Sequence, residues 1–195
     1  MNVRSLRTRR ALLTSARRIL EEEGFDALTM TAVAEGAGVT RRSAYLHFPS
    51  RAELVAGLFD FVAEAEGLHD SLARVWGAPD AAAALDEWAA HLARYHVRLL
   101  PVDRAIARVQ HADADAAAHR QRVSAGKLAG CRRLAKRLRD ERVLAPGWTV
   151  ESAADVIFAL STSDVVEGLI VDRGWSARRF AKHIGLLLRS ALVAR

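Results

Sequence analysis

The residues most suited to binding chemistry lie in one short run, Gly38 to Arg51, which reads GVTRRSAYLHFPSR. The run holds two adjacent arginines, a tyrosine, a histidine and three serine or threonine residues, most of them too polar for a core. Hydroxyl groups bind phosphate oxygens, and arginine can also read the edge of guanine. The run therefore indicates a surface aimed at an anion such as nucleic acid.

The positive charge of the chain is concentrated in the same region. Residues 1–51 hold nine arginines against five acidic residues, so they carry +4 of the total net charge of +6. Arg4, Arg7, Arg9 and Arg10 crowd the start of the first expected helix, the end at which the helix dipole disfavours cations. Both features favour an external anion. Charge alone leaves open a solvated, arginine-rich surface.

Composition predicts a helical protein of the cytoplasm. The chain has 195 residues, 51% of them hydrophobic, with only 12 Gly and 4 Pro, which favours helices over strands. A single Cys excludes a disulfide framework and suits a reducing compartment. We find no signal-peptide core and no apolar run long enough to span a bilayer, so we expect no membrane contact.

The polar run must be positioned by short helices at the N-terminus. We expect a helix over 5–22, a second over 30–36 capped by Thr29, and a third that Thr40 caps and that ends before Pro49. Longer amphipathic helices are expected over 51–75, 80–98, 101–112, 115–143, 150–172 and 176–194. The predicted fold class is all-α, with about nine helices: a three-helix head fused to a helical body.

The second and third expected helices have the dimensions of a helix-turn-helix, whose second helix enters the DNA major groove. Val33 and Ala34 face inward before the turn at Gly36–Ala37–Gly38. Ala44 and Phe48 share one face of the third helix and can pack inward. The polar side chains of that helix are then left pointing mostly outward.

The span LTMTAVAEGAGVTRRSAYLHFPSRAEL resembles the DNA-binding head of the TetR family of transcriptional regulators. Members share a Thr-capped helix, an Ala-x-x-x-Gly turn, a Tyr-x-x-Phe ending and a basic residue opening the fourth helix. The match covers about residues 9–58, and the body matches only in length and helix count. Arg42 stands where many members have a small residue, Ala44 where a larger aliphatic is common, and Arg51 replaces the usual Lys. These departures leave the operator sequence open.

The resemblance implies a DNA-binding domain over 1–50 and an effector-binding and dimerisation domain over 51–195. Residues expected at the DNA backbone are Thr29, Thr31, Ser43, Tyr45, His47 and Arg51. Residues expected at base edges are Thr40, Arg41 and Arg42, at the start of the recognition helix. The alternative for Tyr45 and His47 is packing against the head.

In the resemblance, the body helices before the last pair enclose a small-molecule pocket. Aromatic walls with a few polar groups suit a mainly apolar ligand, and core packing is the alternative. The candidate lining residues are Trp76, Trp88, His91, Tyr95, Arg108 and His111. His91 and His96, five residues apart, do not share one face of an α-helix, so we expect no metal site and no cofactor.

The last two expected helices predict a dimer interface. Residues 153–171 are rich in small and β-branched side chains, and Gly168 would allow close helix approach. Doubled about a two-fold axis, the pair gives a four-helix interface, and closing the monomer core is the alternative. The expected contacts are Val165, Gly168, Ile184 and Leu188.

These features together predict a homodimeric, ligand-responsive DNA-binding transcriptional regulator: a repressor that a small, mainly apolar molecule releases from its operator. One alternative is a DNA-binding regulator without an effector, controlled by a protein partner. A helical enzyme is disfavoured, because the polar residues concentrate on the head and no catalytic constellation converges in the body.

Overall fold

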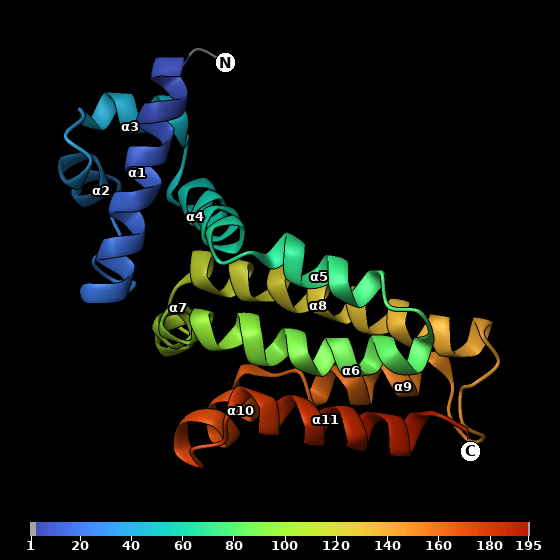
Figure 1. Cartoon of the computed structure of the whole chain (residues 1–195). Coiled ribbons are helices and arrows are strands. Elements are labelled where there is room, and N and C mark those ends of the chain that lie inside the picture. The colour runs from blue at the N-terminus through green and yellow to red at the C-terminus, as the bar shows by residue number, and fades with distance from the viewer. Residues whose placement is uncertain (1–2, 195) are drawn as a thin grey trace. The chain divides into compact units, whose positions relative to one another are not determined.

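The computed structural model describes residues 3–194, which are almost entirely helical. In chain order the helices, shown in Figure 1, are α1 (Val3–Glu22), α2 (Met30–Gly36), α3 (Arg41–His47), α4 (Arg51–Ala65), α5 (Leu68–Trp76), α6 (Ala81–His91), the π-helical η1 (Leu92–His96), α7 (Val97–Val109), α8 (Ala114–Asp140), α9 (Val150–Ala159), α10 (Ser163–Val166), the π-helical η2 (Glu167–Asp172) and α11 (Ala177–Leu192). The extended pairing found within 3–194 is a single isolated bridge between Leu144 and Val193. The predicted all-α class is confirmed.

By its contacts the chain divides into two compact units, which we describe separately. The N-terminal unit comprises the residues up to Glu66 together with Pro101–Arg122. The C-terminal unit comprises Gly67–Leu100 and the residues from Val123 onwards. The boundary expected after residue 50 divides the chain by role rather than by contacts, and it stays a prediction.

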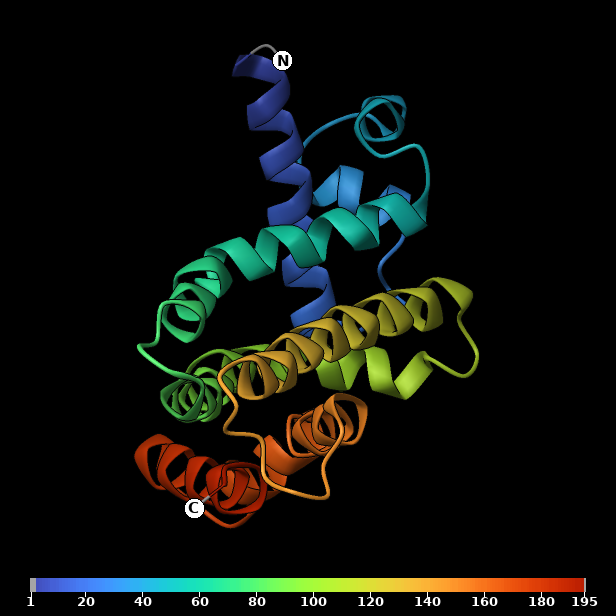
Figure 2. The same cartoon turned by 90° about the vertical axis from the view of Figure 1, so that its right-hand side faces the viewer.

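The head, α1 to α3, forms because two threonines cap its short helices and small residues let them cross. The Thr29 hydroxyl accepts a hydrogen bond from the Ala32 N–H, which begins α2, and Thr40 does the same for the Ser43 N–H at α3. At Gly36, an added Cβ would lie 2.3 Å from the Ser15 hydroxyl of α1, so a side chain there would have to displace the Ser15 hydroxyl. In the same unit α4 packs across α1, as Figure 2 shows.

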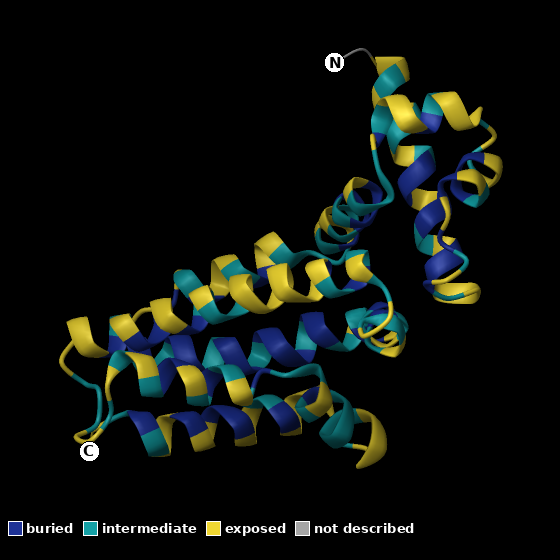
Figure 3. Cartoon of the chain, turned by 180° about the vertical axis from the view of Figure 1, so that it is seen from behind, coloured by how far each residue is buried: buried dark blue, intermediate teal, exposed yellow. Residues whose placement is uncertain are grey.

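In the C-terminal unit the most extensive packing joins α6 to α11. Buried residues follow the facing sides of both helices in Figure 3. The helices approach most closely at Gly185, where an added Cβ would lie 2.6 Å from the Asp86 carboxylate. By contrast, nothing in the chain lies within 4 Å of a Cβ built at Gly168. The close approach expected at Gly168 is therefore made at Gly185 within this chain.

Three expected helices differ from the structure. The helix expected over 51–75 is broken at Gly67, whose φ of 74° ends α4 and starts α5. The break expected at Pro101 is absent, and Pro101 lies inside α7, where its missing N–H removes one helical hydrogen bond. The helix expected over 150–172 is broken after α9, where the Ser161 hydroxyl donates to the Ile157 carbonyl instead of leaving it to the helix. No helix within 3–194 is both long and apolar enough to cross a membrane.

Candidate nucleic-acid interface

The recognition helix α3 exposes its polar face and buries the opposite one. Ala44 and Phe48 are buried against the head, as the spacing predicts. Arg41 and Arg42 at its first turn are exposed, and Tyr45 retains 39% of its surface and Leu46 79%. The exposed side of α3 thus presents Arg41, Arg42, Tyr45 and Leu46.

The hydroxyl groups around this face can cap a helix and bind a phosphate at the same time. Thr29 and Thr40 are both exposed, and each hydroxyl oxygen accepts a backbone N–H as a helix cap. A hydroxyl can accept and donate at once, so its hydrogen is left to donate to a phosphate oxygen. Thr31 is likewise exposed on the first turn of α2, and Ser43 is half-buried on α3. The structure thus gathers the sequence-predicted hydroxyls at the starts of two adjacent helices.

The two exposed arginines of α3 differ in their surroundings. The Arg41 guanidinium lies 5.5 Å from the centre of the Tyr45 ring and 3.4 Å from its hydroxyl, so these side chains lean on each other. No partner of the Arg42 side chain is found among the described residues. Arg42 is therefore the side chain that can extend furthest from α3.

The C-terminal end of α3 is held by α1. Arg9 donates to the His47 carbonyl at 3.1 Å, and its guanidinium lies 4.2 Å from the centre of the Phe48 ring. An added Cβ at Gly57 of α4 would lie 2.8 Å from Phe48, so three helices meet closely at this point. Arg9, expected among the arginines directed at an external anion, is instead used to hold α3 in place. The His47 side chain remains half-buried.

Further basic residues line a groove of about 480 Å³ along α1, beside Gly36 and Ala37. Arg7 and Arg10 are exposed there, and Arg18 is paired with Glu22 of its own helix and with Glu23, which follows it. The arginines that line this groove add positive charge to the head outside α3.

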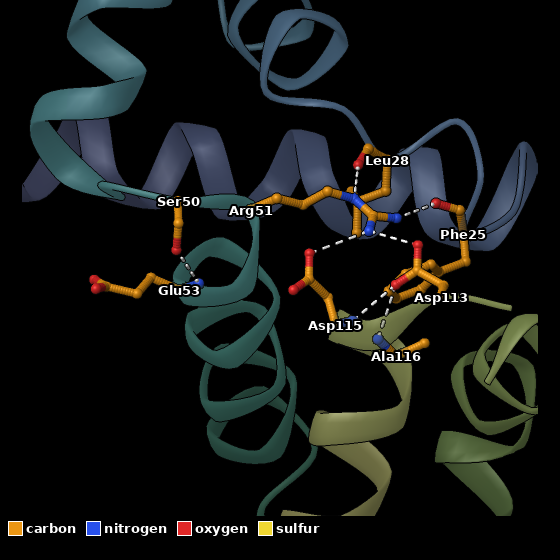
Figure 4. Close-up of polar contacts among 8 residues, drawn as sticks. All are labelled: Phe25, Leu28, Ser50, Arg51, Glu53, Asp113, Asp115 and Ala116. Atoms are coloured by element: carbon orange, nitrogen blue, oxygen red, sulfur yellow. Dashed lines mark hydrogen bonds and ion pairs between the residues drawn. The ribbon is translucent and has the colours of Figure 1, made fainter. Parts of the chain in front are cut away.

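Arg51, expected at the DNA backbone, has four acceptors within the protein. Its guanidinium is bonded to protein atoms of the same unit, namely two carbonyls and the carboxylates of Asp113 and Asp115 (Figure 4). The Arg51 side chain is only 24% exposed. Its expected contact with the DNA backbone stays a prediction.

In the C-terminal unit, four of the expected effector residues form a continuous chain of rings. The ring centres of Trp76 and Trp88 are 6.3 Å apart, those of Trp88 and His91 5.4 Å, and those of His91 and Tyr95 5.4 Å. Trp88, His91 and Tyr95 are buried. Arg108 and His111 are exposed and belong to the N-terminal unit, so within the C-terminal unit they are not part of this cluster.

His96 joins the cluster, which the sequence reasoning missed. A separation of five residues does not share a face in an α-helix, but η1 is π-helical and follows an i to i+5 pattern. The ring centres of His91 and His96 are consequently 5.7 Å apart. The expectation that the two histidines lie on different faces is therefore wrong, and no local signal in LARYH distinguishes a π-helical turn from an α-helical one.

Polar partners from other helices complete the cluster. His91 Nδ1 lies 2.9 Å from the Ser71 hydroxyl, and the Trp88 indole N–H donates to the Ser161 hydroxyl at 2.8 Å. Lys127 of α8 donates to the Ser161 carbonyl at 2.8 Å. These partners come from α5, α8 and the end of α9, so their proximity is a tertiary feature.

Burial sets the protonation of the histidines. It lowers the pKa of His91 to about 4, helped by the positive charges of Arg94 and Lys127. It also lowers the pKa of His96 well below the usual value, with Lys127 and His91 adding to the effect. Both imidazoles are therefore neutral at pH 7. Burial likewise raises the pKa of the Cys131 thiol to about 12, so this cysteine is unreactive at that pH.

The expected dimer contacts divide into buried and accessible residues. Ile184 and Leu188 are buried in the chain's own core, so they cannot contact a second chain while that core is intact. This part of the prediction is wrong because one face of α11 packs on α6. The opposite face carries Leu186 and Leu187, each 50% exposed. Val165 and Gly168 are half-buried.

Comparison with known proteins agrees with this geometry. Residues 12–58 match the model of the family described as bacterial regulatory proteins, tetR family. The HTH-type transcriptional regulator TtgR of Pseudomonas putida is 42% identical over 67 residues, which are 34% of this chain and 30% of TtgR. The chain thus aligns with less than a third of the length of this relative.

Solved structures resemble the whole fold at low identity. NalD, the secondary repressor of the MexAB-OprM multidrug efflux pump in Pseudomonas aeruginosa, superposes with a TM-score of 0.72 at 22% identity, over 97% of both chains. The SmeT–triclosan complex gives a TM-score of 0.73 at 19% identity, over 96% of this chain and 92% of SmeT. At such identities the likeness shows the fold.

A capped helix-turn-helix with an exposed recognition helix, fused to a helical body, defines the class of helix-turn-helix DNA-binding regulators. Over residues 12–58 the head matches the tetR family of bacterial regulatory proteins, as the motif predicts. Proteins of this family are transcriptional regulators rather than enzymes.

Proposed function

We propose that this chain is a homodimeric transcriptional repressor that leaves its DNA operator when a small, mainly apolar molecule binds to the C-terminal unit. The observation that carries DNA binding is the exposed first turn of α3. Thr40, Arg41 and Arg42 stand there together, flanked by the hydroxyls at the start of α2. In helix-turn-helix docking, the start of the recognition helix contacts base edges while surrounding hydroxyls contact phosphates.

The test is selection of operator DNA from a randomised duplex pool. The wild type should enrich a palindrome whose half-sites lie about 10 base pairs apart or a multiple of that. A variant with Arg41→Ala and Arg42→Ala should lose enrichment, whereas Arg132→Ala, an exposed arginine on α8, should retain it. Failure of the wild type to enrich any sequence near physiological salt would contradict the proposal.

A homodimer is supported by two adjacent exposed leucines of α11, Leu186 and Leu187. Leu187→Arg should give a folded monomer, because its side chain is half exposed, while Leu188→Arg should unfold the chain, because its side chain is fully buried. Sedimentation and circular dichroism separate the two outcomes. A wild type that sediments as a monomer at micromolar concentration would rule out the dimer.

An effector is supported by the aromatic rings and neutral histidines gathered in the C-terminal unit. A ligand present at about 100 times its Kd should add about 2.7 kcal/mol to the free energy of unfolding. A thermal-shift panel of apolar molecules should find compounds that stabilise the protein and also release DNA. Because SmeT was crystallised as a complex with triclosan, that compound is a reasonable first member of the panel.

Control by a protein partner, without a small-molecule effector, is the second candidate, and it requires no opening of the ring cluster. Trp76, Trp88, His91 and Tyr95 contact one another, so a ligand at the cluster must displace side chains. If no compound stabilises the protein while operator binding is intact, this candidate gains support. Transcription in vitro from a promoter containing the selected operator tests whether the protein represses.

A further inference from the structure

The Arg51 guanidinium is almost fully used by protein acceptors, as Figure 4 shows. Its Nε donates to the Leu28 carbonyl at 2.8 Å, and one terminal nitrogen donates to the Phe25 carbonyl at 3.1 Å. The other terminal nitrogen donates to Asp113 at 2.7 Å and to Asp115 at 3.3 Å. Of the five N–H groups of an arginine, these contacts use four.

The carboxylate of Asp113 has two separate roles. One oxygen accepts the backbone N–H groups of Asp115 and Ala116, both at 3.0 Å, and so caps the start of α8. The other oxygen accepts Arg51. Burial alone would raise the pKa of Asp113, but the hydrogen bonds from Ala116 and Arg51 outweigh it and lower this pKa. The ion pair is therefore fully charged at neutral pH.

The acceptors of Arg51 lie at two places that matter for DNA binding. Phe25 and Leu28 belong to the turn that leads into α2, and Leu28 directly precedes the Thr29 cap. Asp113 caps the start of α8 and Asp115 lies in its first turn; α8 is a continuous helix that ends at Asp140, within the C-terminal unit. Arg51 thus connects, through its hydrogen bonds, the segment before α2 with the start of α8.

A phosphate contact by the same side chain would be costly. The guanidinium would have to leave two carboxylates and two carbonyls in a partly buried setting, and each abandoned partner would lose its hydrogen bond. A phosphate brought to the guanidinium where it now lies would face both carboxylates, and like charges repel.

We propose that Arg51 is a positioning residue, which holds the start of α2 against the first turn of α8, and that it does not contact DNA phosphate. This inference rests on the proposed DNA-binding function. It implies that a displacement of the first turn of α8 reaches α2 through Arg51. The ring stack of Phe59 on His119, with centres 3.4 Å apart, joins α4 to α8 independently and keeps the unit together when the ion pair is removed.

The decisive variant is Arg51→Lys, because lysine is the usual residue at this position in the resemblance. Lysine keeps the positive charge but cannot bridge four acceptors as a planar guanidinium does. A positioning role predicts that Arg51→Lys weakens operator binding by about tenfold or more, with an unchanged salt slope. If Arg51→Lys binds as tightly as the wild type, or Arg51→Met lowers the salt slope by about one unit, Arg51 is a phosphate contact and the proposal is overturned.

Asp113→Asn provides a second, independent test of the proposal. Asparagine still caps α8 but loses the charge that holds Arg51. The proposal predicts weaker operator binding, and a double variant with Arg51→Lys no weaker than the worse single one. Asp26→Asn, an exposed carboxylate of the same unit, is the matched control and should bind no more weakly than the wild type. Should Asp113→Asn bind like this control, the proposal is wrong.

Hydrogen exchange on the free protein separates this inference from the DNA-binding proposal. Exchange at residues 28–33 should become faster in Arg51→Lys and Asp113→Asn, but not in Asp26→Asn. Unchanged exchange in both Arg51→Lys and Asp113→Asn would overturn the positioning role whatever the DNA results. Absence of operator binding by the wild type, with faster exchange in the variants, would instead refute only the proposed function.

Discussion

The head and the C-terminal unit use polar side chains in opposite ways. On α3, Arg41, Arg42 and Tyr45 are exposed. Around η1, by contrast, His91 and His96 are buried with aromatic rings. A polar group directed at solvent costs the fold little and is available to a partner, whereas a buried one must be satisfied internally or kept neutral. Substitutions in the head should therefore impair binding, and those around η1 should impair stability.

The largest effect is expected from acid on the buried histidines. Since the pKa of His91 is lowered from 6.5 to about 4, the unfolded state binds more protons than the native state between these values. The stability contribution is complete above pH 6.5 and is lost as the pH falls towards 4, amounting to about 3 kcal/mol. Denaturant unfolding from pH 7 to pH 4.5 measures it. His91→Gln should remove this part of the pH dependence and leave the part due to His96, and His69→Gln, an exposed histidine, is the control.

The next effect tests the internal hydrogen bond of the C-terminal unit. Ser161→Ala removes the acceptor of the Trp88 indole N–H and leaves that donor buried without a partner. The expected loss is about 1–3 kcal/mol in the free energy of unfolding. Trp88→Phe combined with Ser161→Ala should cost less than the sum of the single variants. Strict additivity would show that the bond contributes nothing.

In the head, the expected loss is in sequence discrimination rather than stability. Arg42→Ala should reduce discrimination at one base pair of each half-site by about 1–3 kcal/mol, measured on a panel of mutated operators. Its free energy of unfolding should change by no more than about 0.5 kcal/mol, because the side chain is exposed. A uniform loss of affinity across the panel would make Arg42 a phosphate contact instead.

The smallest effect is expected at Thr40, a residue with both a structural and a proposed binding role. Thr40 is exposed on the DNA-facing side and also caps α3 through the Ser43 N–H. Thr40→Ala should cost about 1 kcal/mol of stability, and Thr40→Ser, which restores the cap, should cost much less. If both variants are equally stable in urea, the cap contributes little and Thr40 belongs wholly with the binding residues.

The amino-acid sequence by itself determined the head. Thr29 and Thr40 cap helices locally, Gly36 to Gly38 form the turn, and Ala44 and Phe48 mark the inner face of α3. Such features depend on neighbours a few residues away, and local spacing is sufficient to read them. The aromatic residues around η1 could also be identified from sequence, although not how they meet.

Only the tertiary structure decided the partners of Arg51, the joining of His91 to His96, and the face of α11 left exposed. The acceptors of Arg51 include Asp113 and Asp115, more than 60 residues away, which no local pattern reveals. A π-helical turn brings the two histidines together, against the α-helical period. Packing on α6 buries Leu188 and leaves Leu187 exposed. In each case the deciding feature is a contact between distant segments or a local backbone geometry. Hydrophobic spacing encodes neither, because an amphipathic pattern specifies that a face is buried but not which segment it packs against.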